Sequence, residues 1–166
     1  SKMPADISRT AKRHRRLFDV GLHGPDLFFF YKPVCLYNAM ISPLRNMKFQ
    51  GVLWYQGESN VERRNEYAAL LNGMIKDWRG TFNDFDLPFY IVELAEFLHK
   101  DDDEGRQAWA EMRDEQAKAA KMSRHAVLIK NEDLGEWNDI HPLDKKTLGR
   151  RIAKAALKDI RKQLKQ

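Results

Sequence analysis

The chain has 166 residues, of which 43% are hydrophobic and 32% are charged, as expected for a globular domain with its own core. Its longest apolar run, residues 27–31, is far shorter than the roughly 18 residues that span a bilayer. The single cysteine, Cys35, excludes an intrachain disulfide. The net charge of +5 comes from basic ends, residues 1–16 and 145–166, around an acidic middle, so nucleic-acid binding is not favoured.

Residues 1–27 predict a basic N-terminal arm, and the folded domain is expected over 28–166. A short helix is predicted over 36–47, with Pro43 as a kink or break. The apolar run 51–55 predicts a buried strand. Two further strands are predicted at 88–92 and 126–129 by the same criterion.

Helices are predicted between and after these strands. Asn60 is expected to cap the first, Gly80 to end it, and apolar residues recur at helical spacing at Tyr67, Leu70, Leu71, Met74, Ile75 and Trp78. Four acids at 101–104 precede a second helix, which runs through Met122. His141-Pro142 is expected to open the last helix, whose apolar stripe is Leu148, Ile152, Ala156, Ile160 and Leu164.

Alternating strands and helices predict an α/β fold: a parallel sheet covered by helices on both faces. Ligands bind such sheets at the carboxyl ends of their strands, which share one edge. The residues after each strand are therefore the first candidates for a site, namely 56–60, 93–96 and the long loop 131–141.

The turn 54–60 concentrates polar groups where a strand becomes a helix. Gly57 permits a positive φ or a close approach to a ligand, and backbone N–H groups at the next helix start can hold an oxyanion. A tight turn with an asparagine cap explains the pattern equally well. Ser59 is a weak candidate nucleophile, because Val61 stands where the usual nucleophile elbow has its second glycine.

The loop 133–142 carries the most chemistry. His141 lies among the acids Asp133, Glu136 and Asp139, so it can serve as a general base whose tautomer a carboxylate fixes. The alternative is a surface histidine near a helix start. His99 beside the acids 101–104 fits no familiar metal-ligand spacing, and a solvated helix start explains it better.

These segments together resemble the sialate O-acetylesterase family of the SGNH hydrolases, over about residues 28–158. The most specific stretches are Trp54-Tyr-Gln-Gly-Glu-Ser59 and Asp139-Ile-His-Pro142, in the right order. Further matching pieces are 36–41 with Pro43-Leu44, 51–53, Asp77-Trp-Arg79, 87–90, 133–138, Lys145 and 149–153. The resemblance implies a three-layer α/β/α sandwich and hydrolysis of acetyl esters on sugars, either sialic acid or, as in neighbouring relatives, xylan.

By the same resemblance, His141 is the base that activates a serine, and Gln56, Gly57 and Glu58 shape the oxyanion pocket and substrate cleft. SGNH enzymes commonly place an acid three residues before the histidine, but Asn138 stands there. Asp139 is therefore the predicted orienting acid and Asp133 the reserve. The resemblance implies no metal or organic cofactor. It implies a secreted or periplasmic location, although no signal peptide is visible.

The family's serine lies in a Gly-Gln-Ser-Asn block that this sequence does not contain. We therefore expect a partial SGNH-like domain with the serine outside the chain, and pairing with another copy or with the segment that carries the serine. The alternative function is a carbohydrate-binding remnant that uses Trp54, Tyr55, Gln56 and Trp137 without catalysis.

Overall fold

The computed structural model of the chain describes residues 34–98 and 100–163. The chain separates into two units, residues 1–45 and 46–166. The basic arm predicted over 1–27, its boundary at residue 28, His99 and Leu164 lie outside the described residues.

The described part of the first unit is helical. A π-helix, η2 (Tyr37–Ile41), continues into a 3-10 turn, η3 (Ser42–Leu44), with Pro43 in its first turn. Proline has no N–H for the preceding turn to use, which suits the change from one helix type to another. The helix predicted here is therefore confirmed, but it ends at Leu44, three residues earlier than expected.

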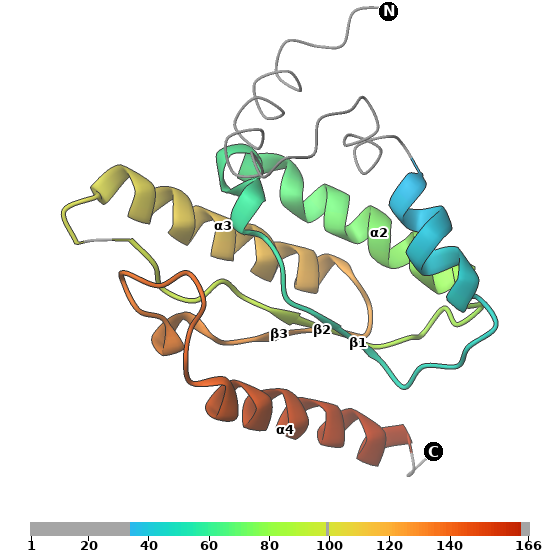
Figure 1. Ribbon diagram of the computed structural model, residues 1–166. Helices are drawn as coiled ribbons and strands as arrows, with labels where there is room; N and C mark the ends of the chain where they lie inside the picture. The colour runs from blue at the N-terminus through green and yellow to red at the C-terminus, as the bar shows by residue number, and fades with distance from the viewer. Residues whose placement is uncertain (1–33, 99, 164–166) are drawn as a thin grey trace, which may run out of the picture. The chain divides into compact units, whose positions relative to one another are not determined.

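The second unit is built on three parallel strands, β1 (Val52–Trp54), β2 (Phe89–Val92) and β3 (Ala126–Ile129), adjacent in that order (Figure 1). The register pairs Leu53 with Tyr90, and Tyr90 with Val127. All three strands predicted from apolar runs are confirmed, but β1 is not buried as predicted: it lies at the edge of the described sheet, and Leu53 is 59% exposed. Their parallel pairing means that all three carboxyl ends meet at one edge of the sheet.

Helices cover both faces of this sheet. Figure 1 shows α2 (Tyr67–Thr81) and α3 (Asp103–Met122) on one face and α4 (Lys145–Gln163) on the other. The predicted three-layer α/β/α arrangement is thus confirmed. Within residues 34–98 and 100–163, no helix is long and apolar enough to cross a membrane.

β2 is the centre of the core. All four of its residues are at most 3% exposed, because successive side chains alternate between the two helical layers. On one face Phe89 packs near Trp78 of α2. On the other face Tyr90 and Val92 cluster with Ile129 and with Leu148 of α4.

The segment between β1 and α2 differs from the prediction. Residues Glu58–Glu66 form a 3-10 stretch, η4, and α2 begins only at Tyr67. Asn60 does not cap a helix, because its Oδ1 accepts a hydrogen bond of 2.7 Å from Gln56 Nε2. The helix also passes Gly80 and ends at Thr81, and Leu70, expected in the apolar stripe, is 55% exposed.

The starts of the other two helices contrast. Asp102 caps α3 as the acidic sequence suggested, with Oδ1 accepting from Gly105 N at 2.9 Å. The last helix begins at Lys145 instead of at Pro142. Asp144 Oδ1 accepts from Thr147 N at 2.9 Å, so Asp144 caps the helix. The prediction placed the start of this helix three residues too early.

The amino edge of the sheet is fixed by a buried guanidinium. Arg79 of α2 is 7% exposed and donates to the carbonyl of Leu87 at 3.1 and 2.9 Å and to that of Arg124 at 2.6 Å. These carbonyls precede β2 and β3. Burial of the guanidinium lowers the pKa of Arg79, while its charge strengthens each bond to a carbonyl.

Candidate active site at the carboxyl edge of the sheet

The turn after β1 is anchored to two helices, α2 and α3. The carbonyl of Gln56 accepts a hydrogen bond from Tyr67 Oη at 2.8 Å and another from Gln116 Nε2 at 3.1 Å. Gln116, on α3, is fully buried, and its Oε1 accepts from Leu94 N at 2.9 Å. Sequence reasoning missed Gln116, although it stands alone as a polar residue on the buried face of α3.

Gly57 is required at the centre of this turn. Its φ is 155°, and a Cβ there would lie 2.8 Å from Met112 Cε and 3.1 Å from Gln116 Nε2. The predicted positive φ is confirmed, whereas the group that approaches this glycine closely is the buried face of α3 and not a ligand.

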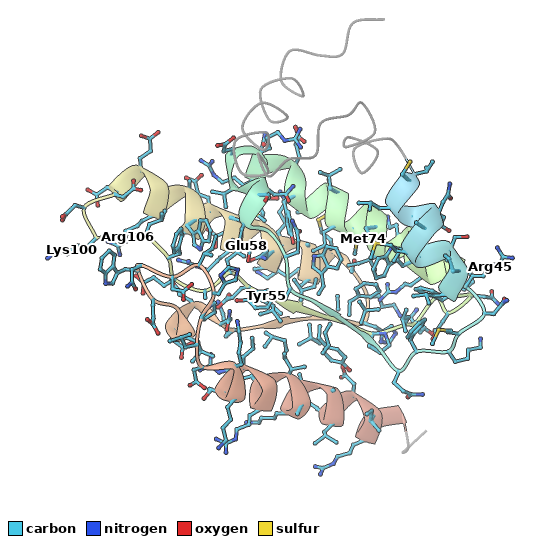
Figure 2. The ribbon with its side chains drawn as sticks, in the orientation of Figure 1. Arg45, Tyr55, Glu58, Met74, Lys100 and Arg106 are labelled. Atoms are coloured by element: carbon cyan, nitrogen blue, oxygen red, sulfur yellow. The ribbon has the colours of Figure 1, made fainter. Side chains whose placement is uncertain are left out.

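The N–H of Gly57 already has a carboxylate partner. Glu58 Oε2 accepts from Gly57 N at 2.9 Å, while the side-chain amide of Gln56 is bonded to Asn60. The Glu58 carboxylate thus occupies the Gly57 N–H, the donor that the sequence predicted for an oxyanion. Figure 2 shows Glu58 and Tyr55 close together in this region.

Tyr55 links the turn after β1 to the loop after β3. Its Oη accepts from Asn131 Nδ2 at 2.9 Å, and Lys145 Nζ lies 5.5 Å from the centre of its ring. Burial, and to a smaller extent the nearby Glu58 carboxylate, raises the pKa of Tyr55. The phenol therefore stays neutral, and its proton remains available to an acceptor.

Glu93, the residue after β2, holds the start of the histidine loop. Its carboxylate is 1% exposed; Oε1 accepts from the backbone N–H of Asn131 at 3.0 Å and of Glu132 at 3.2 Å, and Oε2 accepts from Lys130 Nζ at 2.9 Å. The side chain of Asn131 also donates to the carbonyl of Glu93 at 3.2 Å. Sequence reasoning placed Glu93 at this edge but gave it no role, because its partners lie 38 residues later.

His141 projects from the loop into solvent. Its side chain is 86% exposed, and its Nδ1 lies 3.6 Å from Asp139 Oδ1. The same oxygen accepts the backbone N–H of His141 at 2.7 Å, so Asp139 is fixed beside the ring while the contact with the ring itself stays longer than a hydrogen bond. Asp139 is thus the carboxylate that lies beside the His141 ring.

Asp133, the reserve acid, is committed elsewhere. Its two carboxylate oxygens each accept from Arg151 of α4 at 2.6 Å, and the hydrogen bonds from Arg151 lower the pKa of Asp133. This bidentate pair ties the loop to α4. The geometry therefore favours Asp139 over Asp133 as the partner of His141.

The two predicted parts of the site, the turn after β1 and His141, share the carboxyl edge of the sheet but are not bonded to each other. Across residues 34–98 and 100–163, no hydrogen bond or ion pair joins His141 to Gln56, Gly57 or Glu58. They are connected through Tyr55 and Asn131. Ser59 is exposed at the start of η4, and the part of the chain that the structure describes contains no group of three or more His, Cys, Asp or Glu that could hold a metal.

Known proteins share this sequence and fold. Residues 23–158 match the family model described as carbohydrate esterase, sialic acid-specific acetylesterase. The chain is 33% identical to the human sialate O-acetylesterase over 132 residues, which cover 70% of this chain, and 44% identical to the mouse sialate O-acetylesterase over 73 residues, which cover 39%.

A crystal structure of a carbohydrate acetylesterase from Xanthomonas citri superposes with a TM-score of 0.67 at 37% identity, covering 73% of this chain. The chain spans only a fraction of each relative: 25% of the human protein, 14% of the mouse protein and 28% of the Xanthomonas chain. The likeness in sequence is matched by the parallel sheet and its covering helices, as the SGNH-like prediction required. By sequence and by fold, the chain belongs to the carbohydrate esterase family of sialic acid-specific acetylesterases.

Proposed function

We propose that the chain forms the histidine-bearing part of an esterase that removes acetyl groups from sugar hydroxyls. The observation that carries this proposal is the imidazole of His141, exposed beside Asp139 at the edge where the three strands end. An accessible base next to a fixed carboxylate is the arrangement that acyl transfer needs.

In the proposed reaction the nucleophile is a serine supplied from outside this chain. Nε2 of His141 accepts the serine proton as Oγ attacks the acetyl carbonyl carbon. The tetrahedral intermediate collapses, the sugar oxygen leaves with the proton from the imidazolium, and the serine is acetylated. Water then attacks the acetyl-serine, giving its proton to His141, and acetate departs as the proton returns to Oγ.

Asp139 has the role of fixing the tautomer of His141. A proton on Nδ1 faces Asp139 Oδ1 across 3.6 Å, and a small rotation of the ring closes this gap to a hydrogen bond. Such contacts tighten when substrate binds. The carboxylate then stabilises the imidazolium formed during each proton transfer.

The oxyanion is expected to bind at the turn after β1. The N–H of Gly57 is held by the Glu58 carboxylate, so the side chain of Glu58 must turn away before this donor can serve the substrate. Gln56 can add its side-chain amide by exchanging Asn60 for the substrate. In other hydrolases, each such donor lowers the barrier by roughly 3–4 kcal/mol.

The free side of β1 is the proposed docking edge for the serine-bearing segment. Among the described residues β1 pairs with β2 alone, and Leu53 on this strand is 59% exposed. An unpaired strand edge with apolar surface favours addition of another strand. The occupant is that segment or, failing it, a second copy of the chain; a secreted or periplasmic location is proposed from the family resemblance.

The test is acetate release from O-acetylated sugars by the chain combined with a segment that carries a Gly-Gln-Ser-Asn block. His141→Ala should lower the rate by about 10³-fold or more, because no other base replaces it. His125→Ala is the matched control, since His125 is exposed at the amino edge beside Asp86 and should leave the rate unchanged. Equal rates for wild type and His141→Ala would refute the role of His141.

The binding-module alternative is weakened by the contacts of Trp54. Its ring packs edge-on against Trp78 at 5.9 Å, and its Nε1 donates to Tyr67 Oη at 3.1 Å. Trp54 is thus engaged by helix α2 instead of offering a face on which a sugar could stack.

A further inference from the structure

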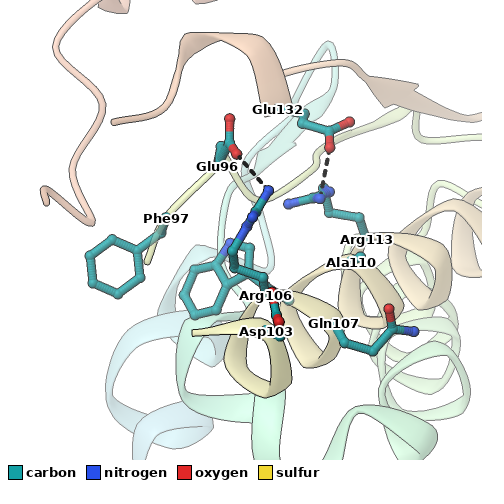
Figure 3. A pocket seen from close by; sticks show the side chains of 9 residues that line it. Glu96, Phe97, Asp103, Arg106, Gln107, Ala110, Arg113 and Glu132 are labelled. Atoms are coloured by element: carbon teal, nitrogen blue, oxygen red, sulfur yellow. Dashed lines mark hydrogen bonds and ion pairs between the residues drawn. The ribbon is translucent and has the colours of Figure 1, made fainter. Parts of the chain in front are cut away.

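A hollow lies between the extension of β2, helix α3 and the start of the histidine loop. It has a volume of about 360 Å³, within the range of small-molecule sites. Figure 3 shows the side chains around it. They come from the segment after β2, from the first half of α3 and from the turn after β3: Glu96, Phe97, Asp103, Arg106, Trp109 and Glu132 among others.

One wall of the hollow is aromatic and rigid. The rings of Phe97 and Trp109 lie 5.3 Å apart. Trp109 is 7% exposed, and its Nε1 donates to the carbonyl of Ala95 at 2.8 Å, which fixes its orientation. Phe97 is only half-buried, so part of its ring is open to a ligand. An apolar ring surface of this kind suits the C–H face of a sugar.

The polar wall offers donors and acceptors together. Arg113 is held tightly, with Nη2 2.7 Å from Glu132 Oε1, whereas Arg106 Nη2 lies 3.6 Å from Glu96 Oε1, a loose contact. Guanidinium N–H groups and carboxylate oxygens therefore face the same space (Figure 3). Sugar hydroxyls both donate and accept, so they match such paired charges.

The charge of the lining selects against anions. Three acids, Glu96, Asp103 and Glu132, face two arginines, so the hollow carries no excess of positive charge. The one negative charge in excess would repel a carboxylate or sulfate on the ligand, but it would not repel an uncharged ring. The ligand that fits is a neutral sugar.

The hollow is connected to the loop that carries His141. Glu96 N donates to the carbonyl of Glu132 at 3.0 Å, and Leu98 N donates to that of Trp137 at 2.9 Å. The backbone of Glu96 also packs directly against Gly135. The wall of the hollow and the base of the histidine loop are therefore one hydrogen-bonded unit.

We infer that this hollow, named here the Phe97 pocket, binds a neutral sugar ring adjoining the acetylated sugar of the substrate. The inference rests on the proposed function and adds to it a neutral neighbouring ring, so the substrate is an O-acetylated sugar within an oligosaccharide or polysaccharide. The acetylated ring lies at His141, and the next ring of the glycan lies along Phe97, Arg106 and Glu96.

The test compares two trisaccharides of opposite character, xylotriose, which is neutral, and trigalacturonic acid, which is anionic. Titration calorimetry on the protein should show binding of xylotriose and weaker binding of trigalacturonic acid. Phe97→Leu, which keeps the apolar volume but loses the flat ring, should weaken xylotriose binding roughly five- to tenfold. Arg106→Gln should do the same by removing charged donors.

Arg124→Gln is the control, because this exposed arginine lies at the opposite edge of the sheet and should leave binding unchanged. Failure of xylotriose to bind, binding by both pocket variants as tight as that of the wild type, or preference for trigalacturonic acid would each overturn the inference. Hydrolysis of p-nitrophenyl acetate, which has no sugar ring, tests the role of His141 separately from that of the pocket. It should depend on His141 and should be unaffected by Phe97→Leu. Loss of the His141 dependence rejects the proposed function, and unaltered sugar binding rejects the pocket.

Discussion

The amino and carboxyl edges of the sheet are held by buried side chains of opposite charge. At the amino edge the guanidinium of Arg79 donates to two carbonyls that precede strands. At the carboxyl edge the carboxylate of Glu93 accepts from the backbone N–H groups of two residues that follow β3. Each charge is thus matched to the backbone groups that the strands leave unpaired there.

The difference lies in what each edge does next. The hydrogen bonds of Arg79 end at backbone carbonyls. The network of Glu93 continues through Asn131 to Tyr55, beside the turn that carries Gln56 and Gly57. The amino edge therefore contributes stability, while the carboxyl edge also sets the relative position of two loops. This division agrees with the general rule that α/β sheets bind ligands at their carboxyl ends.

The largest effect is expected from Arg79→Met. The substitution removes three hydrogen bonds and leaves the carbonyls of Leu87 and Arg124 without the guanidinium as a donor. The free energy of unfolding should therefore fall by about 3–5 kcal/mol. Urea denaturation measures this. Sugar binding by the Phe97 pocket should survive in the folded fraction, and an effect on binding larger than that on stability would break the division between the edges.

Arg124→Met is the matched control for this prediction. The side chain of Arg124 is 77% exposed and pairs with the exposed Asp86. Its removal should change stability by no more than about 0.5 kcal/mol, because exposed ion pairs contribute little. A loss equal to that of Arg79→Met would show that the amino edge depends on surface charge.

Alkaline pH should loosen both edges together, because β2 runs between them. Burial, with the nearby Asp159 carboxylate, raises the pKa of Tyr90 from 10.0 to about 12. The pKa is higher in the folded state, so the stabilisation is complete below pH 10 and is lost as the pH rises towards 12. The free energy of unfolding should fall by about 2–3 kcal/mol over this window.

Tyr90→Phe separates this titration from other alkaline effects. The variant should lack this part of the pH dependence, since phenylalanine has no proton to lose. Unfolding curves recorded for both proteins across the window give the difference. Parallel curves would mean that the phenol ionises without cost in the folded chain.

A smaller and more local effect is expected from Glu93→Gln. The amide oxygen can still accept both backbone N–H bonds, but the NH2 group that replaces Oε2 cannot accept from Lys130, so stability should fall by about 1–2 kcal/mol. Amide hydrogen exchange should speed up over residues 130–141 and stay unchanged before β2 and β3. The turnover of acetylated sugar should fall and its KM should rise, because Glu93 holds Glu132, which belongs both to the histidine loop and to the lining of the Phe97 pocket.

Glu136→Gln is the control in the same loop, since Glu136 is exposed and its removal should leave exchange and turnover as they are. Uniformly faster exchange across the whole sheet in Glu93→Gln would instead identify Glu93 as a general stabiliser with no special relation to the histidine loop.

The smallest effect is expected from Asp102→Ala at the start of α3, beside the Phe97 pocket. Loss of the cap should cost about 1 kcal/mol and speed amide exchange at Gly105 and Arg106. Asp102→Asn should restore most of the stability, because asparagine caps nearly as well. If both variants destabilise equally, the charge of Asp102 matters more than its hydrogen bond.

The sheet could be predicted from the sequence because its signal is local. Each strand is a short apolar run, and β2, buried on both faces, has no polar residue. Helix starts were less predictable, because a cap depends on which competing partner is nearer. Asn60 is taken by the side chain of Gln56, and Asp144 caps α4 where His141-Pro142 was expected to open it.

The site was predictable in its residue types and edge but not in its contacts. Glu93, Asn131 and Gln116 act through groups 22 to 76 residues away, and periodicity carries no information at that range. The occupation of Gly57 N by its own neighbour Glu58 was also invisible, since a carboxylate beside a donor can point either way. The roles of His141 and Asp139 remain predictions for the experiments above.

The contact between Gly135 and Glu96 limits how this chain can vary. A Cβ at position 135 would overlap the backbone nitrogen and oxygen of Glu96, and backbone cannot move aside as a flexible side chain can. In a library of random variants selected for acetyl removal, position 135 should therefore accept glycine alone. Its neighbour Glu136, exposed to solvent, should tolerate nearly every replacement.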